Sequence, residues 1–172
     1  LSAEIAASLE EEDVCQRVVA GLRDESLGYN LIGVFLLDEN TGERVLRACV
    51  GWDHVQVGLR IGAGHGLTEQ ALRTKKLSYT ADVAHAPDYV ATFPTGSEVD
   101  IPLIVEGEAV GVLCVQSHEV DAFGKPDFEI LTAAANQASI AIARARLLVN
   151  ERRRADEQQA LLDSMSDLAS AL

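Results

Sequence analysis

Two pairs of apolar segments, each pair joined by a short turn, constrain the fold of this 172-residue chain more than any other feature. The first pair occupies residues 31–52 and turns at 38–42, and the second occupies 97–117 and turns at 106–108. Runs of aliphatic and β-branched residues bounded by Gly, Asn and Asp predict β-hairpins, whose strands pair antiparallel. The second hairpin is almost continuously apolar from Ile101 onward, which predicts a central position covered on both faces.

Helices are predicted on either side of these hairpins. Apolar residues at helical spacing before the first hairpin predict an amphipathic helix that ends near Gly28. After the second hairpin, the i, i+3, i+4 spacing from Phe128 to Ala145 predicts a long helix, and because no Gly or Pro follows Pro126 we expect it to reach the C-terminus. Shorter segments predict a strand at 57–61, a helix at 67–74 and a strand at 77–79. The order predicts an α+β fold with a mainly antiparallel sheet and helices packed on one side.

Charge and hydropathy narrow the class of partner. The chain has 27 acidic and 14 basic residues and a net charge of −13, so it repels nucleic acid and anionic membrane surfaces. No apolar run approaches the roughly 20 residues needed to span a bilayer. The chain begins at Leu1 without Met, basic region or cleavage site, so we expect no secretory signal and a longer parent protein. The odd number of cysteines without a C-x-x-C predicts a reducing, cytoplasmic location.

The cysteines and histidines do not predict a metal centre or a disulfide framework. The cysteine count is odd and no C-x-x-C occurs. Mid-strand cysteines in apolar runs are typical small core residues, which is our interpretation of Cys49 and Cys114. The histidines share no spacing such as H-x-x-x-H. The residues concerned are Cys15, Cys49, Cys114, His54, His65, His85 and His118.

A loop at 82–96 is enriched in aromatic residues, which make up only 5% of the chain. Aromatic faces and carboxylates beside a sheet predict a pocket for a small polar, ring-bearing ligand. The alternative is that Tyr89 and Phe93 only anchor the loop to the sheet. The nearby glycines at 62–66 open a short helix and can direct backbone N–H groups at an anion, or they can serve only as turns. They match neither the dinucleotide fingerprint nor a P-loop.

Several segments, in this order and spacing, resemble the GAF domain family over about residues 1–150. They are Gly62-Ala-Gly-His-Gly66-Leu67-Thr68, Leu77-Ser-Tyr-Thr-Ala-Asp82-Val83, Ala86-Pro87-Asp88-Tyr89, Ser97-Glu98-Val99-Asp-Ile101-Pro102-Leu103, Gly107-Glu-Ala-Val-Gly111-Val112-Leu113-Cys-Val115, Phe123-Gly-Lys-Pro-Asp127 and Ile140-Ala141-Ile142-Ala143. The resemblance implies a GAF-like (PAS-related) antiparallel sheet of five to six strands. It places the N- and C-terminal helices on one face, and short helices and loops that form a pocket on the other.

The resemblance does not name a ligand, because GAF domains bind cyclic nucleotides, bilins, haem, formate, amino acids or nothing known. Phe123 and Asp127 match the end of the cyclic-nucleotide signature, but Phe128 stands where its Glu is expected and no Asn-Lys partner precedes them. No Cys lies between Val50 and Leu113, which disfavours a covalent bilin and the pocket cysteines of free methionine sulfoxide reductases. We therefore expect no cofactor, no haem, a colourless protein and no enzymatic activity.

The function predicted by the resemblance is a regulatory, small-molecule-binding sensory domain. Its parent would be a signal transduction protein such as a sensor histidine kinase of a two-component system or a cyclic-di-GMP enzyme, with the output domain on the same polypeptide. A ligand-free dimerisation module is the alternative, and a free methionine sulfoxide reductase is a remote one. Candidate ligand-binding residues are Trp52, Gly66, Leu67, Tyr79, Asp82, Val83, Tyr89, Phe93, Ser97 and Val99.

Beyond the domain at 1–150, residues 151–172 are predicted to form a helical linker to a following module. Spacings of three and four residues from Leu148 to Leu172 predict a weak heptad seam and therefore a homodimer through the terminal helices. A likeness between residues 4–9 and 167–172 favours a tandem arrangement of helix-led modules. Candidate interface residues are Ile5, Leu9, Leu148, Ala155, Leu162 and Met165.

Overall fold

The computed structural model describes residues 3–23, 27–51, 57–89 and 94–170, with side chains from residue 10 onward. In chain order its elements are α1 (Ala3–Leu22), β1 (Leu31–Leu37), β2 (Arg44–Val50), β3 (Arg60–Ile61), α2 (Thr68–Thr74), β4 (Ser78–Thr80), the 3-10 helix η2 (Val83–His85), β5 (Ser97–Val105), β6 (Glu108–Ser117) and α3 (Lys125–Ser170). Both predicted hairpins are confirmed, as β1–β2 and β5–β6.

The strands form one six-stranded sheet in the order β3-β2-β1-β6-β5-β4. Every neighbouring pair is antiparallel, and the two hairpins join through β1 and β6, where Val34 lies opposite Leu113. The second hairpin is therefore central, as its apolar strands predicted. This sheet with its helices confirms the predicted α+β fold class with an antiparallel sheet of five to six strands.

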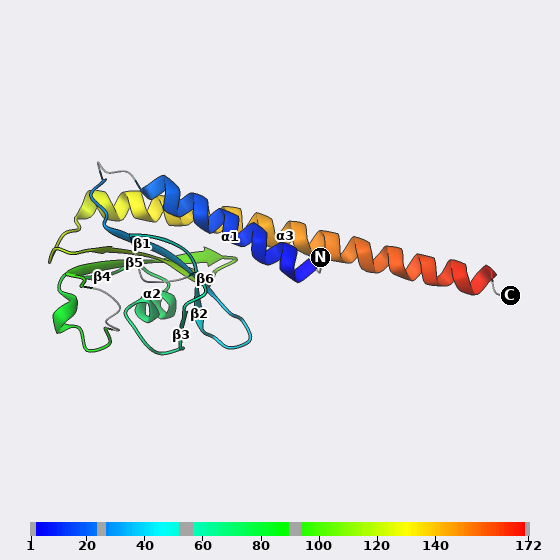
Figure 1. Cartoon of the computed structure of the whole chain (residues 1–172), viewed down its shortest axis with the longest axis horizontal. Helices are drawn as coiled ribbons and strands as arrows, with labels where there is room; N and C mark the ends of the chain where they lie inside the picture. Colours follow the sequence, from blue (N-terminus) through cyan, green and yellow to red (C-terminus); the bar gives the residue numbers. More distant parts are fainter. Residues whose placement is uncertain (1–2, 24–26, 52–56, 90–93, 171–172) are drawn as a thin grey trace.

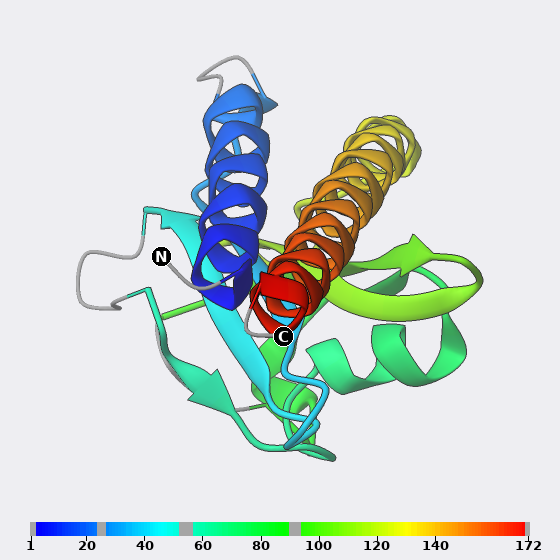
Figure 2. The same cartoon turned by 90° about the vertical axis from the view of Figure 1, so that its right-hand side faces the viewer.

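Helices α1 and α3 lie side by side over one face of the sheet, while α2 lies against the other (Figures 1 and 2). Side chains that alternate along the strands, such as Ile32, Val99 and Leu113, pack with Cys15 and Leu131 from the helices in the larger hydrophobic core. Ion pairs hold the two helices together above it. Arg146 Nε lies 2.7 Å from Glu11 Oε1, and Arg152 Nη1 lies 2.7 Å from Glu10 Oε1.

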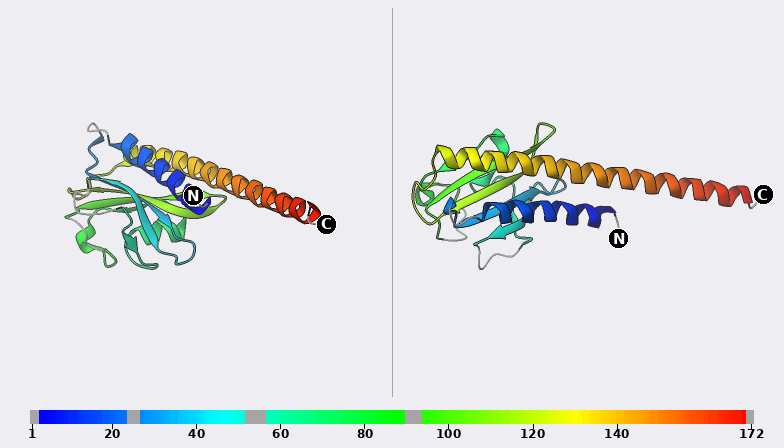
Figure 3. Two further views of the ribbon diagram at one scale, coloured as in Figure 1. Left: turned by 45° about the vertical axis from the view of Figure 1, so that its right-hand side comes forward. Right: turned by 90° about the horizontal axis from the view of Figure 1, so that it is seen from above.

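Helix α3 continues well beyond the sheet, past the N-terminal end of α1 (Figure 3). Residues 151–170 are exposed along their whole length. The helix is unbroken from Lys125 to Ser170, so the predicted division of the chain at residue 150 stays a prediction. Within the described residues, no helix is long and apolar enough to cross a membrane.

Two predicted boundaries were wrong. Helix α1 ends at Leu22 rather than near Gly28, because Leu22 is the last buried residue of its apolar stripe and charged residues follow it. The strand expected at 57–61 contains only Arg60–Ile61. Gly58 has a φ of +98°, a left-handed conformation that interrupts an extended strand.

Candidate functional site

The face of the sheet opposite α1 and α3 carries a buried polar cluster on the central hairpin. Glu98 and Asp100 on β5 lie opposite Gln116 and Cys114 on β6. Their exposed fractions are 4%, 1%, 5% and 1% respectively. We call these four residues the polar cluster. Alternation along the strands places them on this face, because their neighbours Val99, Leu113 and Val115 belong to the core under the helices.

A small cavity of about 30 Å³ adjoins this cluster. A cavity of that size accommodates a water molecule or an ion. Its wall is built by β1, β3, α2, the glycine-rich segment and the central hairpin. The lining residues are Phe35, Leu59, Ile61, Gly66, Leu67, Thr68, Tyr89, Glu98, Cys114 and Gln116.

Hydrogen bonds orient the members of the polar cluster. The amide of Gln116 donates to Glu98 Oε2 over 2.7 Å and lies 3.7 Å from Cys114 Sγ. Thr95 Oγ1 in turn donates to Gln116 Oε1 over 3.0 Å, and Thr95 also hydrogen-bonds to Tyr89. This series of hydrogen bonds connects the loop that carries Tyr89 to the carboxylate of Glu98.

The two carboxyl groups of the cluster hydrogen-bond to each other, Glu98 also to Gln116 and Asp100 also to Cys114. Burial raises the pKa of Glu98, and burial together with the charge of Glu98 raises the pKa of Asp100 well above its usual range. Buried carboxyl groups held side by side do not both ionise readily. Burial, reinforced by Glu98 and Asp100, also raises the pKa of the Cys114 thiol, which favours its neutral form.

Arg44 ties the glycine-rich segment to the sheet. Its guanidinium is fully buried and donates to Glu69 Oε2 over 2.9 Å, to the Gly62 carbonyl over 2.6 Å and to the His65 carbonyl. Glu69 also accepts from the backbone N–H of Gly64 over 3.1 Å. Burial lowers the pKa of Arg44, whereas Glu69 and Asp100 raise it. In the glycine-rich segment, the carbonyls of Gly62 and His65 therefore accept hydrogen bonds from Arg44, and the N–H of Gly64 donates one to Glu69.

Three polar atoms around this site are buried without a hydrogen-bond partner among the described residues: Arg44 Nε, Thr68 Oγ1 and Asp100 Oδ1. An unpaired buried polar group costs roughly 1–3 kcal/mol. Such a concentration on one sheet face is typical of a functional site rather than of a stabilising core.

The structure brings together only some of the sequence-predicted ligand-binding residues. Gly66, Leu67 and Tyr89 line the cavity, whereas Trp52 and Phe93 lie outside the described residues.

The other predicted residues that the structure describes do not line this cavity, so the prediction of one cavity shared by all of them is corrected. Tyr79 packs edge-on against Phe123 under the helices and donates to Asp121 over 2.8 Å, and Val99 is in the same core. Asp82 and Ser97 hydrogen-bond to backbone groups, and Val83 is buried. Asp82 accepts from the Ala84 N–H and Ser97 donates to the Glu119 carbonyl, while Val83 is 2% exposed and away from the cavity wall. Strand alternation is the reason, because it sends Tyr79 and Val99 to the helix face.

The sequence analysis missed the polar cluster, together with Arg44 and Thr68. A usable signal was present: charged or amide side chains at alternate positions, Glu98 and Asp100 on one strand and Gln116 on its partner, in a hairpin expected to be covered on both faces. Buried charges require a partner or a ligand. Cys114 was interpreted as a core residue, and it is buried but also lines the cavity.

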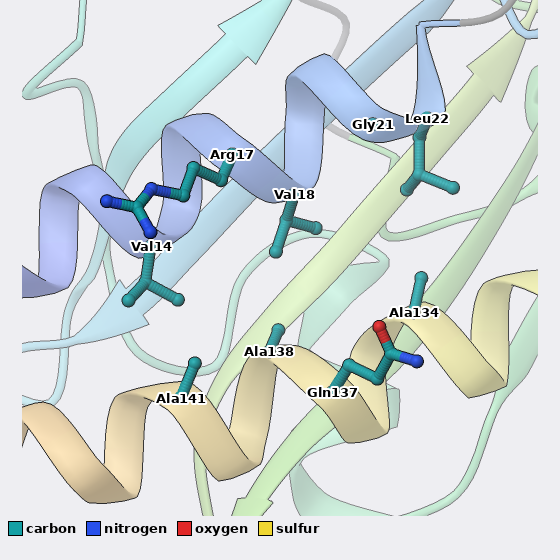
Figure 4. A pocket seen from close by; sticks show the side chains of 9 residues that line it. All are labelled: Val14, Arg17, Val18, Gly21, Leu22, Ala134, Gln137, Ala138 and Ala141. Carbon is teal, nitrogen blue, oxygen red and sulfur yellow. The ribbon is translucent and has the colours of Figure 1, made fainter.

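A second hollow, of about 360 Å³, lies between α1 and α3 (Figure 4). Side chains from the two helices, including Val14, Val18 and Ala141, point toward one another across it. It is separate from the polar cluster, which lies on the other face of the sheet.

On α3, the predicted interface residues Leu148, Leu162 and Met165 are 47%, 54% and 60% exposed, and Ala155 is exposed. The side chains of Ile5 and Leu9 lie outside the described part.

Residues 8–143 match the sequence model of the GAF domain. The chain belongs to the GAF domain family. A GAF domain of a phosphoenolpyruvate-protein phosphotransferase from Coxiella burnetii is 29% identical, with a TM-score of 0.73 over 80% of this chain and 84% of that one. No curated protein sequence matches this GAF domain.

Two further solved structures show how widely this GAF fold is used. A type II free methionine-R-sulfoxide reductase from Thermoplasma acidophilum is 28% identical, with a TM-score of 0.70 over 80% of this chain and 96% of that one. Residues 122 to 287 of a methyl-accepting chemotaxis protein are 24% identical, with a TM-score of 0.70 over 80% and 92%. At that identity the chemotaxis protein supports the shared fold alone.

The prediction that this GAF domain is not an enzyme is contradicted by the similarity to the reductase. The prediction rested on the absence of a cysteine between Val50 and Leu113. That argument also fails, because Cys114 lies just beyond this interval and lines the cavity. Its place on β6, opposite Asp100, follows from strand pairing and not from loop position.

Thiol reactivity should follow burial. Cys49 is half-buried, whereas Cys15 and Cys114 are 0% and 1% exposed, and burial raises the pKa of Cys15 to about 12. Because the thiolate is the reactive form, native protein at pH 8 should be alkylated first at Cys49 and at all three cysteines only after unfolding. Peptide mass spectrometry after timed iodoacetamide treatment measures the order. Modification of Cys114 before Cys49 would contradict it.

Proposed function

We propose that this chain is a ligand-binding regulatory GAF domain of a larger signal transduction protein, such as a sensor histidine kinase or a cyclic-di-GMP enzyme. The observation that carries the proposal is the polar cluster beside a cavity. Burying Glu98 and Asp100 side by side costs stability, and retaining such groups is typical of binding sites. Two buried neighbouring carboxyl groups favour a cationic ligand or a ligand rich in hydrogen-bond donors.

A route from the site to the terminal helices supports a regulatory role. The same β5 strand that carries Glu98 and Asp100 donates from the Ile104 N–H to Ser139 Oγ on α3 over 2.9 Å. Ser139 also donates to the Ala135 carbonyl, so it lies fixed within the helix. A ligand that shifts β5 would therefore bias the position of α3, and a long helix transmits such a shift to a following module.

The test measures the unfolding temperature with a panel of amines, amino acids, nucleotides and divalent metal ions. A ligand that binds only the native state raises the melting temperature. Glu98→Gln should abolish the shift, whereas the matched variant Glu108→Gln, whose side chain is 78% exposed on the same hairpin, should retain it. A shift that survives Glu98→Gln, or no shift with any class, would contradict the proposal.

Reduction of free methionine-R-sulfoxide is a second candidate function. Cys114 at the cavity and the 28% identity to the Thermoplasma reductase favour it. Oxygen transfer would break the substrate S=O bond and form a bond from oxygen to Cys114 Sγ, with the thiol proton moving to that oxygen. The products are methionine and a sulfenic acid, which two equivalents of added thiol reduce back to the thiol with release of water.

The assay follows methionine formation from the free R-sulfoxide with dithiothreitol as reductant. Turnover that is lost in Cys114→Ser and retained in Cys49→Ser would establish this function. The raised pKa of Cys114 opposes its action as a nucleophile until a substrate changes its surroundings. Absence of turnover in the wild-type protein would remove this candidate and leave ligand binding untouched.

The exposed seam on α3 leads us to expect a homodimer. Leu162 and Met165 are 54% and 60% exposed on the part of the helix that extends beyond the sheet, and pairing two such helices buries them. Charged residues at both positions should convert the dimer into a monomer in sedimentation velocity. The control Ala160→Glu/Ser164→Glu places the same charge at positions outside the seam and should leave the dimer intact. A wild-type monomer at high micromolar concentration would contradict the expectation.

A further inference from the structure

We infer that Glu98, Asp100 and Cys114 form a binding site for a divalent transition-metal ion with one coordination position open to the cavity. The inference rests on the proposed function, because it names the class of ligand that the polar cluster takes. It requires only residues of the central hairpin.

Geometry is the first support. One ligand atom from each residue, a carboxylate oxygen from Glu98 and Asp100 and Sγ from Cys114, lies within 4.8 Å of the other two. Donor atoms around a tetrahedral ion are separated by roughly 3.3–3.8 Å, so an ion would have to draw any two of them together by no more than about 1.5 Å. Glu98 can supply much of this movement through its long side chain, while Asp100 and Cys114 face each other across paired strands.

Unpaired polar atoms are an independent support. Asp100 is 1% exposed, and its Oδ1 has no hydrogen-bond partner among the described residues. Thr68 is 4% exposed, lines the same cavity as Glu98 and Cys114, and has an unpartnered Oγ1. A metal ion would satisfy the carboxylate, and a water molecule on the ion would offer a partner to the threonine hydroxyl. The cavity of about 30 Å³ has room for that water.

Charge and donor chemistry select the class of ion. With their protons released on binding, two carboxylates and a thiolate would offer three negative charges to the ion, and the nearby guanidinium of Arg44 is already paired with Glu69 over 2.9 Å. A divalent ion would then compensate these charges within a desolvated site. A mixture of hard oxygens and one soft sulfur is typical of zinc, cobalt or ferrous iron, whereas magnesium and calcium prefer oxygen alone. Three protein ligands and an open position are the pattern of sites that bind a further small molecule.

Hydrogen bonds from Gln116 would serve this site as outer support. Its amide donates to Glu98 Oε2 and lies near Cys114 Sγ, so it orients two of the three ligands. Outer partners of this kind tune metal affinity by roughly 10- to 100-fold. Through Thr95, the same amide is linked to the loop that carries Tyr89. Occupation of the site would therefore be linked to the cavity wall as well as to β5.

The test titrates Co²⁺ into the full chain after treatment with EDTA and removal of the chelator. We expect a thiolate-to-cobalt charge-transfer band in the near ultraviolet that saturates at one equivalent and is displaced by Zn²⁺ but not by Mg²⁺. Cys114→Ser should lose the band, and the matched control Cys49→Ser should keep it. Asp100→Asn and Glu98→Gln should each weaken binding by more than the 10- to 100-fold typical of outer partners.

Several results would overturn the inference. They are the absence of a band at stoichiometric Co²⁺, a band retained in Cys114→Ser, or unchanged affinity in both carboxamide variants. Circular dichroism confirms the fold of each variant, and if one is unfolded the other carboxamide variant decides. If EDTA-treated protein binds an organic compound through Glu98 while Co²⁺ does not bind, the metal site is wrong and the proposed function stands. If neither binds, both are wrong.

Discussion

Replacing Arg44 with Met is expected to lower the free energy of unfolding by about 1–3 kcal/mol, because it leaves two backbone carbonyls and the 33%-exposed Glu69 without their donor. The side chain is 0% exposed and donates to Glu69 and to the carbonyls of Gly62 and His65. Methionine occupies similar space but leaves these acceptors unpaired. The wall that contains Gly66 and Thr68 then loses its attachment to β2, so ligand binding should fall together with stability.

Urea denaturation measures the change, and Arg60→Met is the matched control. Arg60 lies on the neighbouring strand and pairs with Asp38 at 2.9 Å and Glu43 at 2.6 Å, but its side chain is 48% exposed. Exposed pairs contribute about 0–1 kcal/mol. Equal losses in the two variants would show that burial of the Arg44 guanidinium is not what stabilises the segment.

Gly111→Ala should destabilise the protein by roughly 3 kcal/mol, at the upper end of the cost of overpacking a core. An added Cβ at Gly111 would lie 2.3 Å from the Phe35 carbonyl oxygen and 2.8 Å from Leu36 Cδ2. The first of these is backbone on the strand paired with β6, so β1 and β6 must separate. These are the strands through which the two hairpins join, and Cys114 and Gln116 follow on the same strand.

Gly21→Ala provides the opposite expectation. Nothing lies within 4 Å of a Cβ at this position of α1. Because Gly21 lies in the last turn of α1, alanine there should raise the free energy of unfolding by somewhat less than the roughly 0.5–1 kcal/mol gained in a helix interior. Denaturant midpoints of both variants, measured side by side, test the argument, which fails if Gly111→Ala is as stable as the wild-type protein.

Local sequence was sufficient for the elements themselves. Alternation and turn residues predicted both hairpins, and the three-and-four spacing after Pro126 predicted the long helix α3. These patterns depend on contacts between near neighbours in the chain. The end of α1 was misplaced because it depends on where burial against the sheet stops, at Leu22.

The candidate site was predicted only in part for a related reason. Gly66, Leu67 and Tyr89 were predicted from the loop pattern together with the family resemblance, and they do line the cavity. Tyr79, in the same sequence neighbourhood, faces the opposite side of the sheet, where its ring packs against Phe128. Aromatic enrichment along the chain does not indicate which face of the sheet a side chain occupies. Residues that are neighbours in sequence were therefore predicted to share one pocket, although they lie on opposite faces of the sheet.

The sequence by itself determined the order of helices and strands, the antiparallel hairpins and membership of the GAF family, because each follows from local periodicity and from spacing along the chain. Only the tertiary structure decided the polar cluster. Arg44 lies on the first hairpin and Asp100 on the second, and they interact only because β1 pairs with β6. Helices α1 and α3 cover the larger apolar face of the sheet, because burying that face stabilises the fold most. Glu98 and Cys114 alternate with the apolar residues along their strands, so they lie on the opposite face, beside the cavity.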